Sequence, residues 1–187
     1  MTNKNKLPII NQAKPLTQSK FFAVEELDLT FSNGEKRVYE RMKGGGRGAV
    51  MVVPFKDPNT LILVREYCAG THSYELGFPK GLIDPDELPE QSANRELKEE
   101  IGFGANHLVY LHQVRLAPAF FNAKMDIFIA RDLYPEQLEG DEPEPLEIVE
   151  WPIEDYLSLL AQPDFSEARS IAALMLVIDR LRRGDEQ

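Results

Sequence analysis

Three glutamates in one short segment are candidates to bind a divalent metal ion. Glu96 and Glu100 are four residues apart, and Glu99 directly precedes Glu100. On a helix this spacing places the three carboxylates on one side, where each like-charged pair costs about 0.2–0.5 kcal/mol. A cation would remove that repulsion, and carboxylate oxygens suit Mg²⁺ or Mn²⁺ better than Zn²⁺. The alternative interpretation is an ordinary solvated acidic face of a helix.

The segment that carries these glutamates has the pattern of a helix. Ala93, Leu97 and Ile101 recur at four-residue spacing, which predicts a helix over residues 90–101 with one apolar face for burial. Pro89 suits the first helical turn, and the residue after Ile101 is a glycine, which suits a helix end. Such a helix would hold the carboxylates in fixed relative positions.

The same glutamates belong to a longer signature that covers residues 81–103, GLIDPDELPEQSANRELKEEIGF. Its other fixed residues are Gly81, Glu87, Arg95 and Gly102. Arg95 lies four residues before Glu99, so it can hold a carboxylate in place from behind the metal. By this signature the chain resembles the Nudix hydrolase family, provided that a strand and a loop precede the helix.

The flanking residues predict the elements that position this helix. Short apolar runs predict strands at 49–55, 61–64, 108–116, 124–130 and 147–151, and helical spacing recurs at 153–161 and 166–183. Residues 81–86 are expected to form a loop that leads into the helix. The apolar stripe of 166–183 fits core packing or, alternatively, a partner-binding face. The interspersed elements predict an α/β (α+β) sandwich of the Nudix type, with helices covering a mixed sheet.

The N-terminal residues predict a separate β-hairpin. Residues 21–31 and 36–42 alternate apolar and polar side chains around an Asn33-Gly34 turn. An isolated hairpin is marginal in water, so we expect it to pack on its own domain or on a second subunit. The expected organisation is a flexible leader over 1–19, a hairpin and hinge over 20–46, and a catalytic domain over 47–187. The glycine-rich residues 43–47 are interpreted as the hinge or, alternatively, as a phosphate-binding loop.

Composition restricts the class of protein. The formal net charge is −10, which disfavours binding to nucleic acid or to an anionic membrane. The single cysteine, Cys68, excludes an intrachain disulfide and favours a reducing compartment. It could act as a nucleophile only with a base, and His72 is the nearest. No apolar run has the length of a membrane span, so we expect a cytoplasmic protein.

Within the family, the chain is similar to the ADP-ribose pyrophosphatase branch over most of its length. That resemblance implies a metal-dependent hydrolase of ADP-linked compounds, including ADP-ribose, NADH and short diadenosine polyphosphates. It also implies a homodimer with exchanged N-terminal hairpins, which would supply the partner that the hairpin lacks. The cofactor would be Mg²⁺ or Mn²⁺, with two or more ions per site.

The resemblance assigns roles residue by residue. Glu96, Glu99, Glu100 and the backbone carbonyl of Lys80 would bind the metal ions. The general base would come either from the signature, at Glu96 or Glu99, or from a later acidic loop over residues 140–150. This loop offers Asp141, Glu142, Glu144 and Glu147, of which Glu142 and Glu144 are the candidates. The alternative interpretation of the loop is a solvated acidic turn. Glu40, Arg41, Arg65 and Pro118 occupy places where relatives contact substrate.

The resemblance leaves the preferred substrate open. Pro118, fifteen residues after the signature, matches the ADP-ribose enzymes, but the sequence F-P-K-G at 78–81 matches polyphosphate hydrolases and puts Gly77 where ADP-ribose enzymes have glutamate. A sugar nucleotide or a diadenosine polyphosphate is therefore an alternative main substrate. A non-catalytic ligand sensor is a further alternative, although the signature keeps all its carboxylates. The charge disfavours an RNA-decapping enzyme.

Overall fold

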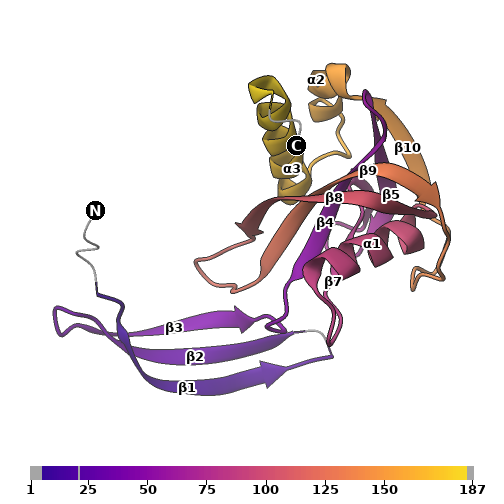
Figure 1. Ribbon diagram of the computed structural model, residues 1–187. Coiled ribbons are helices and arrows are strands. Elements are labelled where there is room, and N and C mark those ends of the chain that lie inside the picture. Colours follow the sequence, from indigo (N-terminus) through magenta and orange to yellow (C-terminus); the bar gives the residue numbers. More distant parts are fainter. Residues whose placement is uncertain (1–5, 21, 185–187) are drawn as a thin grey trace. The chain divides into compact units, whose positions relative to one another are not determined.

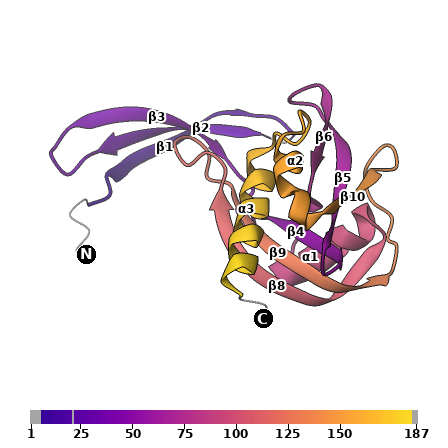
Figure 2. The same ribbon diagram turned by 90° about the horizontal axis from the view of Figure 1, so that it is seen from above.

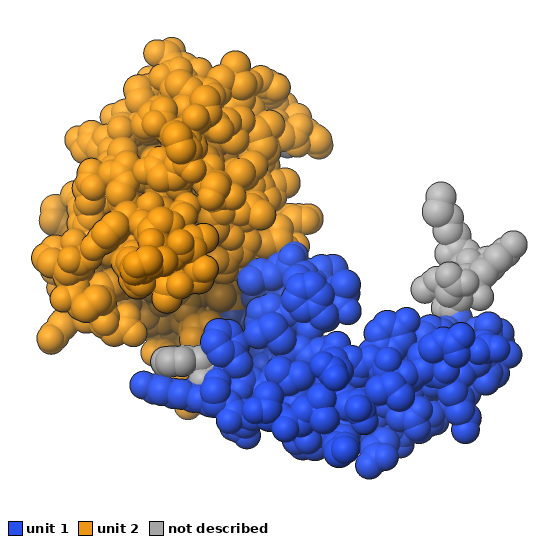
Figure 3. Space-filling model, turned by 180° about the vertical axis from the view of Figure 1, so that it is seen from behind, with its two compact units in different colours: residues 1–48, 115–124 blue, residues 49–114, 125–187 orange. Residues whose placement is uncertain are grey.

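The computed structural model describes residues 6–20 and 22–184 of the chain (Figure 1). Its contacts divide it into two units, which Figure 3 distinguishes by colour. Unit 1 comprises residues 1–48 and 115–124, and unit 2 comprises residues 49–114 and 125–187. The expected hairpin began at Phe21, which lies outside the described residues, as do residues 1–5 of the expected leader. Among the described residues, no helix is long and apolar enough to span a membrane.

Unit 2 is built on a mixed sheet of seven strands. They are β4 (Ala49–Asp57), β5 (Thr60–Cys68), β6 (Ser73–Gly77), β7 (Lys80–Leu82), β8 (Phe103–Arg115), β9 (Lys124–Pro135) and β10 (Glu147–Pro152). The order is β10-β5-β4-β9-β8, with β6 also paired to β5 and β7 also paired to β4. Strands β4 and β9 run parallel, whereas β4 pairs antiparallel with both β5 and β7.

The central strands are buried on both faces because their sequences are apolar without interruption. Successive side chains of β4 point to opposite faces, so Met51 and Val53 join one core while Val50 and Val52 join the other. Helix α1 (Pro89–Glu100) covers the second core, to which it contributes Ala93 and Leu97. Helices α2 (Tyr156–Leu160) and α3 (Ala168–Arg183) cover the opposite face of the sheet, as Figure 2 shows. The predicted mixed sheet between helices is confirmed.

Most predicted elements of unit 2 are present, and some are longer than their apolar runs. The helix predicted at 90–101 is α1, and the helix predicted at 166–183 is α3, whose apolar stripe packs in the core. The helix predicted at 153–161 is shorter, a 3-10 turn (Ile153–Asp155) followed by α2. The loop predicted at 81–86 is wrong at its start, because β7 continues through Leu82 by pairing with β4.

Unit 1 contains a three-stranded antiparallel sheet in place of the predicted two-stranded hairpin. Its strands are β1 (Ile9–Gln18), β2 (Ala23–Thr30) and β3 (Lys36–Lys43), with β2 in the centre. The turn between β2 and β3 is confirmed, with Gly34 at a positive φ of 86°. The expected leader is wrong for residues 9–18, because these residues pair with β2 along its whole length. An edge strand tolerates polar residues and a proline, here Pro15, so its sequence resembles a loop.

A second segment of unit 1, residues 115–124, is attached to the end of β3. The N–H of Met42 donates to the carbonyl of Phe120 at 2.7 Å, and the N–H of Gly44 donates to Oδ1 of Asn122 at 2.7 Å. The glycine-rich residues 43–47 include Gly44 of this attachment and lead from β3 into β4. This position agrees with their interpretation as a connection between the two units.

Candidate active site

Two of the three candidate metal-binding glutamates are buried on α1. Glu96 is 7% exposed and Glu100 is 6% exposed, one helical turn apart. Glu99 is partly exposed. Carboxylates are seldom this buried unless a charged partner or a metal compensates for the lost hydration. The solvated acidic face, which was the alternative interpretation, is therefore excluded for Glu96 and Glu100.

Strand β7 brings the chain directly against these carboxylates. The backbone N–H of Lys80 donates to Oε1 of Glu100 at 3.1 Å. A Cβ atom added at Gly81 would overlap the carboxylate of Glu96. The fixed glycine of the signature is thus required by close approach of the backbone, since its φ is not in the left-handed region. The short strand that the sequence did not predict is the element that sets this approach.

Arg95 organises the acidic residues of the signature. Its Nε lies 3.0 Å from Oε1 of Glu87, and its Nη1 lies 2.7 Å from Oε1 of Glu96 and 2.8 Å from Oε2 of Glu99. Nη2 donates to the carbonyl of Leu82 at 2.9 Å, at the end of β7. One guanidinium therefore joins three carboxylates of the signature to the neighbouring strand. The predicted contact between Arg95 and Glu99 is present.

Burial and the guanidinium of Arg95 shift the pKa values of these carboxylates in opposite directions. Burial raises the pKa of Glu96 to about 7, although Arg95 opposes the shift. Burial also raises the pKa of Glu100 well above its ordinary value. The hydrogen bonds from Arg95 lower the pKa of Glu87. The metal-free protein therefore holds Glu96 and Glu100 where ionisation is unfavourable without a further positive charge.

These side chains have the chemistry of a site for a hard divalent cation. Oε2 of Glu100 is buried and makes no hydrogen bond to the described residues. Among those residues, no three acidic, histidine or cysteine side chains already surround a common point, because Arg95 pairs with Glu96 and Glu99. The unpartnered oxygen and the all-oxygen donor set fit Mg²⁺ or Mn²⁺.

The side chain of Lys80 was not predicted to take part in this site. Its ammonium forms an ion pair with Glu66 on β5, and the Lys80 side chain is mostly buried. Its charge opposes the rise in the pKa of Glu100, so it lies close to that carboxylate. No sequence pattern predicts this contact, because Glu66 and Lys80 meet only in the folded sheet, from separate strands.

The acidic loop between β9 and β10 contains both predicted loop bases. A Cβ atom added at Gly140 would overlap Oε2 of Glu142 and lie 3.7 Å from the backbone carbonyl of Glu99, so the Glu142 carboxylate lies near the end of α1. Glu144 instead accepts a hydrogen bond from the hydroxyl of Tyr74 on β6. The structure therefore brings Glu142 toward the signature helix and holds Glu144 against the sheet.

Arg65, a predicted substrate ligand, is bound to two carboxylates of unit 2. Its Nη1 lies 2.6 Å from Oε1 of Glu147, and its Nε lies 2.9 Å from Oδ2 of Asp164. The hydrogen bonds from Glu147 and then Asp164 raise the pKa of Arg65. The side chain is partly exposed at the end of β5 that faces the acidic loop.

The other three predicted substrate ligands belong to unit 1. Arg41 is paired with the buried carboxylate of Glu25, with Nη2 2.6 Å from Oε1, in neighbouring strands of the three-stranded sheet. Glu40 is exposed opposite Glu26. Pro118 is exposed in the turn of residues 118–120. The pairing of Arg41 with Glu25 was not predicted.

Two further sequence features have structural explanations. Gly77, which replaces the glutamate of ADP-ribose enzymes, lies against α3, where an added Cβ would be 3.0 Å from Oγ of Ser170.

The proposed base for Cys68 is engaged elsewhere, because Nδ1 of His72 lies 2.9 Å from the hydroxyl of Tyr67. Burial raises the pKa of the Cys68 thiol, which disfavours a nucleophilic thiolate.

Comparison with known proteins agrees with this geometry. The NudE-type Nudix hydrolase N-terminal domain matches residues 8–41, and the NUDIX domain matches residues 46–174. The chain is 54% identical over 182 residues to ADP compounds hydrolase NudE of Escherichia coli (strain K12), covering 97% of each chain. It is 28% identical to ADP-ribose pyrophosphatase of Bacillus subtilis (strain 168), covering 87% of this chain and 91% of that protein.

A solved structure extends the similarity to three dimensions. The crystal structure of an ADP compounds hydrolase matches with a TM-score of 0.92 and 53% identity, and covers 98% of both chains. The match includes the N-terminal part as well as the domain that carries the signature. The NUDIX domain match spans most of unit 2 and includes Gly81, Glu87, Arg95 and the buried glutamates. The chain belongs to the Nudix hydrolase family.

Proposed function

We propose that the chain is a metal-dependent pyrophosphohydrolase that cleaves ADP-linked compounds to AMP and a second phosphorylated product. Its substrates would include ADP-ribose, NADH and short diadenosine polyphosphates. The observation that carries the proposal is the buried pair of Glu96 and Glu100 beside Gly81, in a chain closely similar to an ADP compounds hydrolase. The net charge of −10 and the single cysteine support a cytoplasmic enzyme for small substrates, with no nucleic acid or membrane partner.

Glu96, Glu99, Glu100 and the backbone carbonyl of Lys80 would bind Mg²⁺ or Mn²⁺, with two or more ions per site. The unpartnered oxygen of Glu100 supports this assignment. Bound metal would supply positive charge at the phosphate oxygens and lower the pKa of a bound water. Arg95 would then keep Glu87 as its main partner and orient the neighbouring carboxylates.

The reaction would be hydrolysis of the phosphoric anhydride. The oxygen of a water molecule would attack one phosphorus, the bond from that phosphorus to the bridging oxygen would break, and the bridging oxygen would leave on the other phosphate. A carboxylate must accept the proton of the water. We assign this role first to Glu142, because its carboxylate lies near the end of α1, whereas Glu144 is bound to Tyr74. Glu99 on α1 is the alternative base.

The ammonium of Lys80 is suited to contact substrate phosphate. It is a mostly buried cation in a site of several carboxylates, and it forms an ion pair with Glu66. A phosphate oxygen entering the site would compete with Glu66 for the same donor. This contact would offset part of the negative charge that the acidic residues present to the substrate.

We also propose that the sheet of unit 1 mediates a homodimer. Within the described part of unit 1 there is no helix to cover either face of this sheet. Several apolar side chains of the unit are exposed, namely Leu7, Ile9, Ile10, Leu16, Phe22, Val38, Tyr39, Leu116 and Phe120. A three-stranded sheet gains its stability from packing on another layer, and a second copy of the chain would supply one.

The test of the proposed function is release of a nucleoside monophosphate from a panel of four compounds: AMP from ADP-ribose, NADH and diadenosine triphosphate, and GMP from GDP-mannose. Each compound is incubated with Mg²⁺, with Mn²⁺ or with a chelator. Metal-dependent AMP release from the ADP compounds supports the proposal, and faster turnover of GDP-mannose would favour a sugar-nucleotide enzyme. Absence of turnover with every compound would favour the ligand sensor.

A further inference from the structure

A pocket of about 250 Å³ in unit 2 adjoins the carboxylate site. Its walls are the outer end of β5, the facing part of β6 and the acidic loop. Two wall residues connect it to the site. Glu66 pairs with the ammonium of Lys80, and Oε2 of Glu142 lies beside Gly140, where an added Cβ would be 3.7 Å from the backbone carbonyl of Glu99. The pocket therefore lies next to residues of the candidate site.

The wall on the sheet side consists of two tyrosines. Tyr67 and Tyr74 are directly paired across β5 and β6, with ring centroids 5.9 Å apart and ring planes 66° apart. They are 47% and 52% exposed. The ring of Tyr67 also meets the ring of His72 edge-to-face, with centroids 5.9 Å apart. In an edge-to-face pair one face of the contacted ring remains uncovered, so this half-exposed pair offers a flat apolar surface to a planar ligand.

The hydroxyl groups of both rings are already fixed. Tyr67 is bonded to His72, and Tyr74 is bonded to Glu144 of the acidic loop. The rings are therefore held in place at the pocket, which lowers the entropy lost when a ligand stacks on them. The opposite wall presents carboxylates, which accept hydrogen bonds from ring N–H and exocyclic amino groups.

We propose that this pocket binds a nucleobase of the substrate by stacking on Tyr67 and Tyr74. The proposal rests on the proposed function only for the identity of the compound that carries the base. Two sources share this chemistry. One is the adenine common to all ADP compounds, and the other is the second base of a dinucleotide. Tyr67 and Tyr74 are thus specificity residues for the base and take no part in the hydrolysis step.

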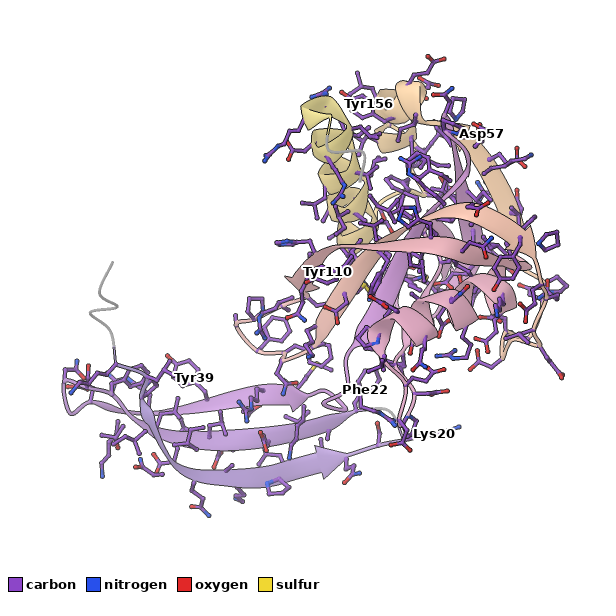
Figure 4. The ribbon with its side chains drawn as sticks, in the orientation of Figure 1. Lys20, Phe22, Tyr39, Asp57, Tyr110 and Tyr156 are labelled. Atoms are coloured by element: carbon purple, nitrogen blue, oxygen red, sulfur yellow. The ribbon has the colours of Figure 1, made fainter. Side chains whose placement is uncertain are left out.

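The test compares Tyr67→Leu and Tyr74→Leu with two controls. Tyr74→Phe keeps the ring and removes the hydroxyl that holds Glu144. Tyr110→Leu removes a tyrosine that is also half exposed and edge-to-face with a neighbour, Phe128, but lies on β8 outside the pocket (Figure 4). Calorimetry with the full chain in a chelator measures binding of AMP, and of ribose 5-phosphate as the ligand without a base.

The two leucine variants should bind AMP about 5- to 100-fold more weakly, the effect of removing one base–aromatic stack. Ribose 5-phosphate binding should not change, and Tyr74→Phe and Tyr110→Leu should bind AMP like the unsubstituted chain. The proposal is overturned if the leucine variants bind AMP as tightly as Tyr110→Leu does. It is also overturned if Tyr74→Phe loses as much affinity for AMP as Tyr74→Leu does, because Tyr74 would then act by holding Glu144. Absence of AMP binding by the unsubstituted chain would overturn it as well.

Hydrolysis then distinguishes the source of the base. A loss of kcat/KM for diadenosine triphosphate without a loss for ADP-ribose assigns the pocket to the second base. An equal loss for both substrates assigns it to the shared adenine. If the unsubstituted chain hydrolyses neither compound but its AMP binding depends on the tyrosines, the proposed function fails while the base pocket stands.

Discussion

The backbone N–H of Lys80 donates to one oxygen of Glu100 at 3.1 Å, while the other oxygen is buried and makes no hydrogen bond to the described residues. A carboxylate in this position loses hydration without full compensation, which destabilises its charged form. Strand β7 and helix α1 thus place in the site a Glu100 carboxylate of which only one oxygen accepts a hydrogen bond from the described residues. This arrangement disfavours the charged form of Glu100, and the proposed cation would bind the free oxygen.

The substitution Glu100→Gln tests that proposal. It should reduce metal-dependent hydrolysis by at least about 10³-fold, because the free anionic oxygen is lost, and should weaken Mn²⁺ binding in equilibrium dialysis. The fold should remain intact, with an unfolding midpoint in a chelator no lower than that of the original chain. Glu90→Gln, at an exposed position of the same helix, is the matched control and should change neither quantity. Near-normal activity of Glu100→Gln would refute the metal assignment.

Gly81→Ala tests the close approach between β7 and α1. The added methyl group would overlap the Glu96 carboxylate and displace it, so activity should fall by about 10²-fold or more. Gly70→Ala is the control, because an added Cβ there meets no atom within 4 Å. Both variants are assayed for hydrolysis and for Mn²⁺ affinity. Equal behaviour of the two alanine variants would show that Glu96 does not need its observed position.

The pH dependence of stability should reveal the cap of α3. Burial disfavours the charge of Glu167, but Arg169 and the N–H of Ser170 outweigh it and hold the pKa of Glu167 below its ordinary value of 4.5. The ionised cap therefore stabilises the fold above about pH 4.5, and this contribution is lost as the pH falls through the lower folded value.

Glu167→Ala should accordingly lower the free energy of unfolding by about 1 kcal/mol at neutral pH, the usual value of a helix cap. The difference should shrink in acid, below the pKa of the folded protein. Urea unfolding of the original chain and of Glu167→Ala, at neutral and at acidic pH, measures this difference in the free energy of unfolding. A difference that stays constant over this range would show that the charge of Glu167 is not responsible.

The proposed dimer can be tested on the full chain. Ile9 and Val38 are exposed on the edge strands of the unit 1 sheet, and replacing both with glutamate should prevent an apolar contact between copies. Sedimentation over a range of concentrations should show a dimer for the original chain and a monomer for the double variant. Leu157→Glu, an exposed site on α2, serves as the control and should stay dimeric. A monomeric original chain would contradict the proposal.

The sequence predicted the elements whose residues interact locally. Helix α1 was predictable because Ala93 and Leu97 follow the helical period, and β4 was predictable because its apolar run is uninterrupted. Strand β1 was not predictable, since every residue of it is exposed and none marks an apolar face. Strand β7 has three residues and exists through pairing with β4, which local pattern does not show.

The residues of the candidate site also fall into two groups, those that local sequence predicted and those that it did not. The helical spacing predicted that Glu96 and Glu100 share a side of α1, and the signature supplied Gly81 and Arg95. The contacts of Lys80 with Glu66 and of Tyr74 with Glu144 join residues 14 and 70 positions apart, so only the folded sheet brings them together. The residues proposed to bind metal were therefore accessible from sequence, whereas those that shape the pocket were not.

The most direct test of the central claim is AMP release from ADP-ribose by the purified chain with Mg²⁺, with Mn²⁺ and with a chelator. The claim predicts stoichiometric AMP and ribose 5-phosphate with either metal and none with the chelator. It also predicts that Glu100→Gln forms AMP at least about 10³-fold more slowly with either metal. AMP release that persists in the chelator, or that stays near normal in Glu100→Gln, would contradict hydrolysis by metal held at the buried glutamates.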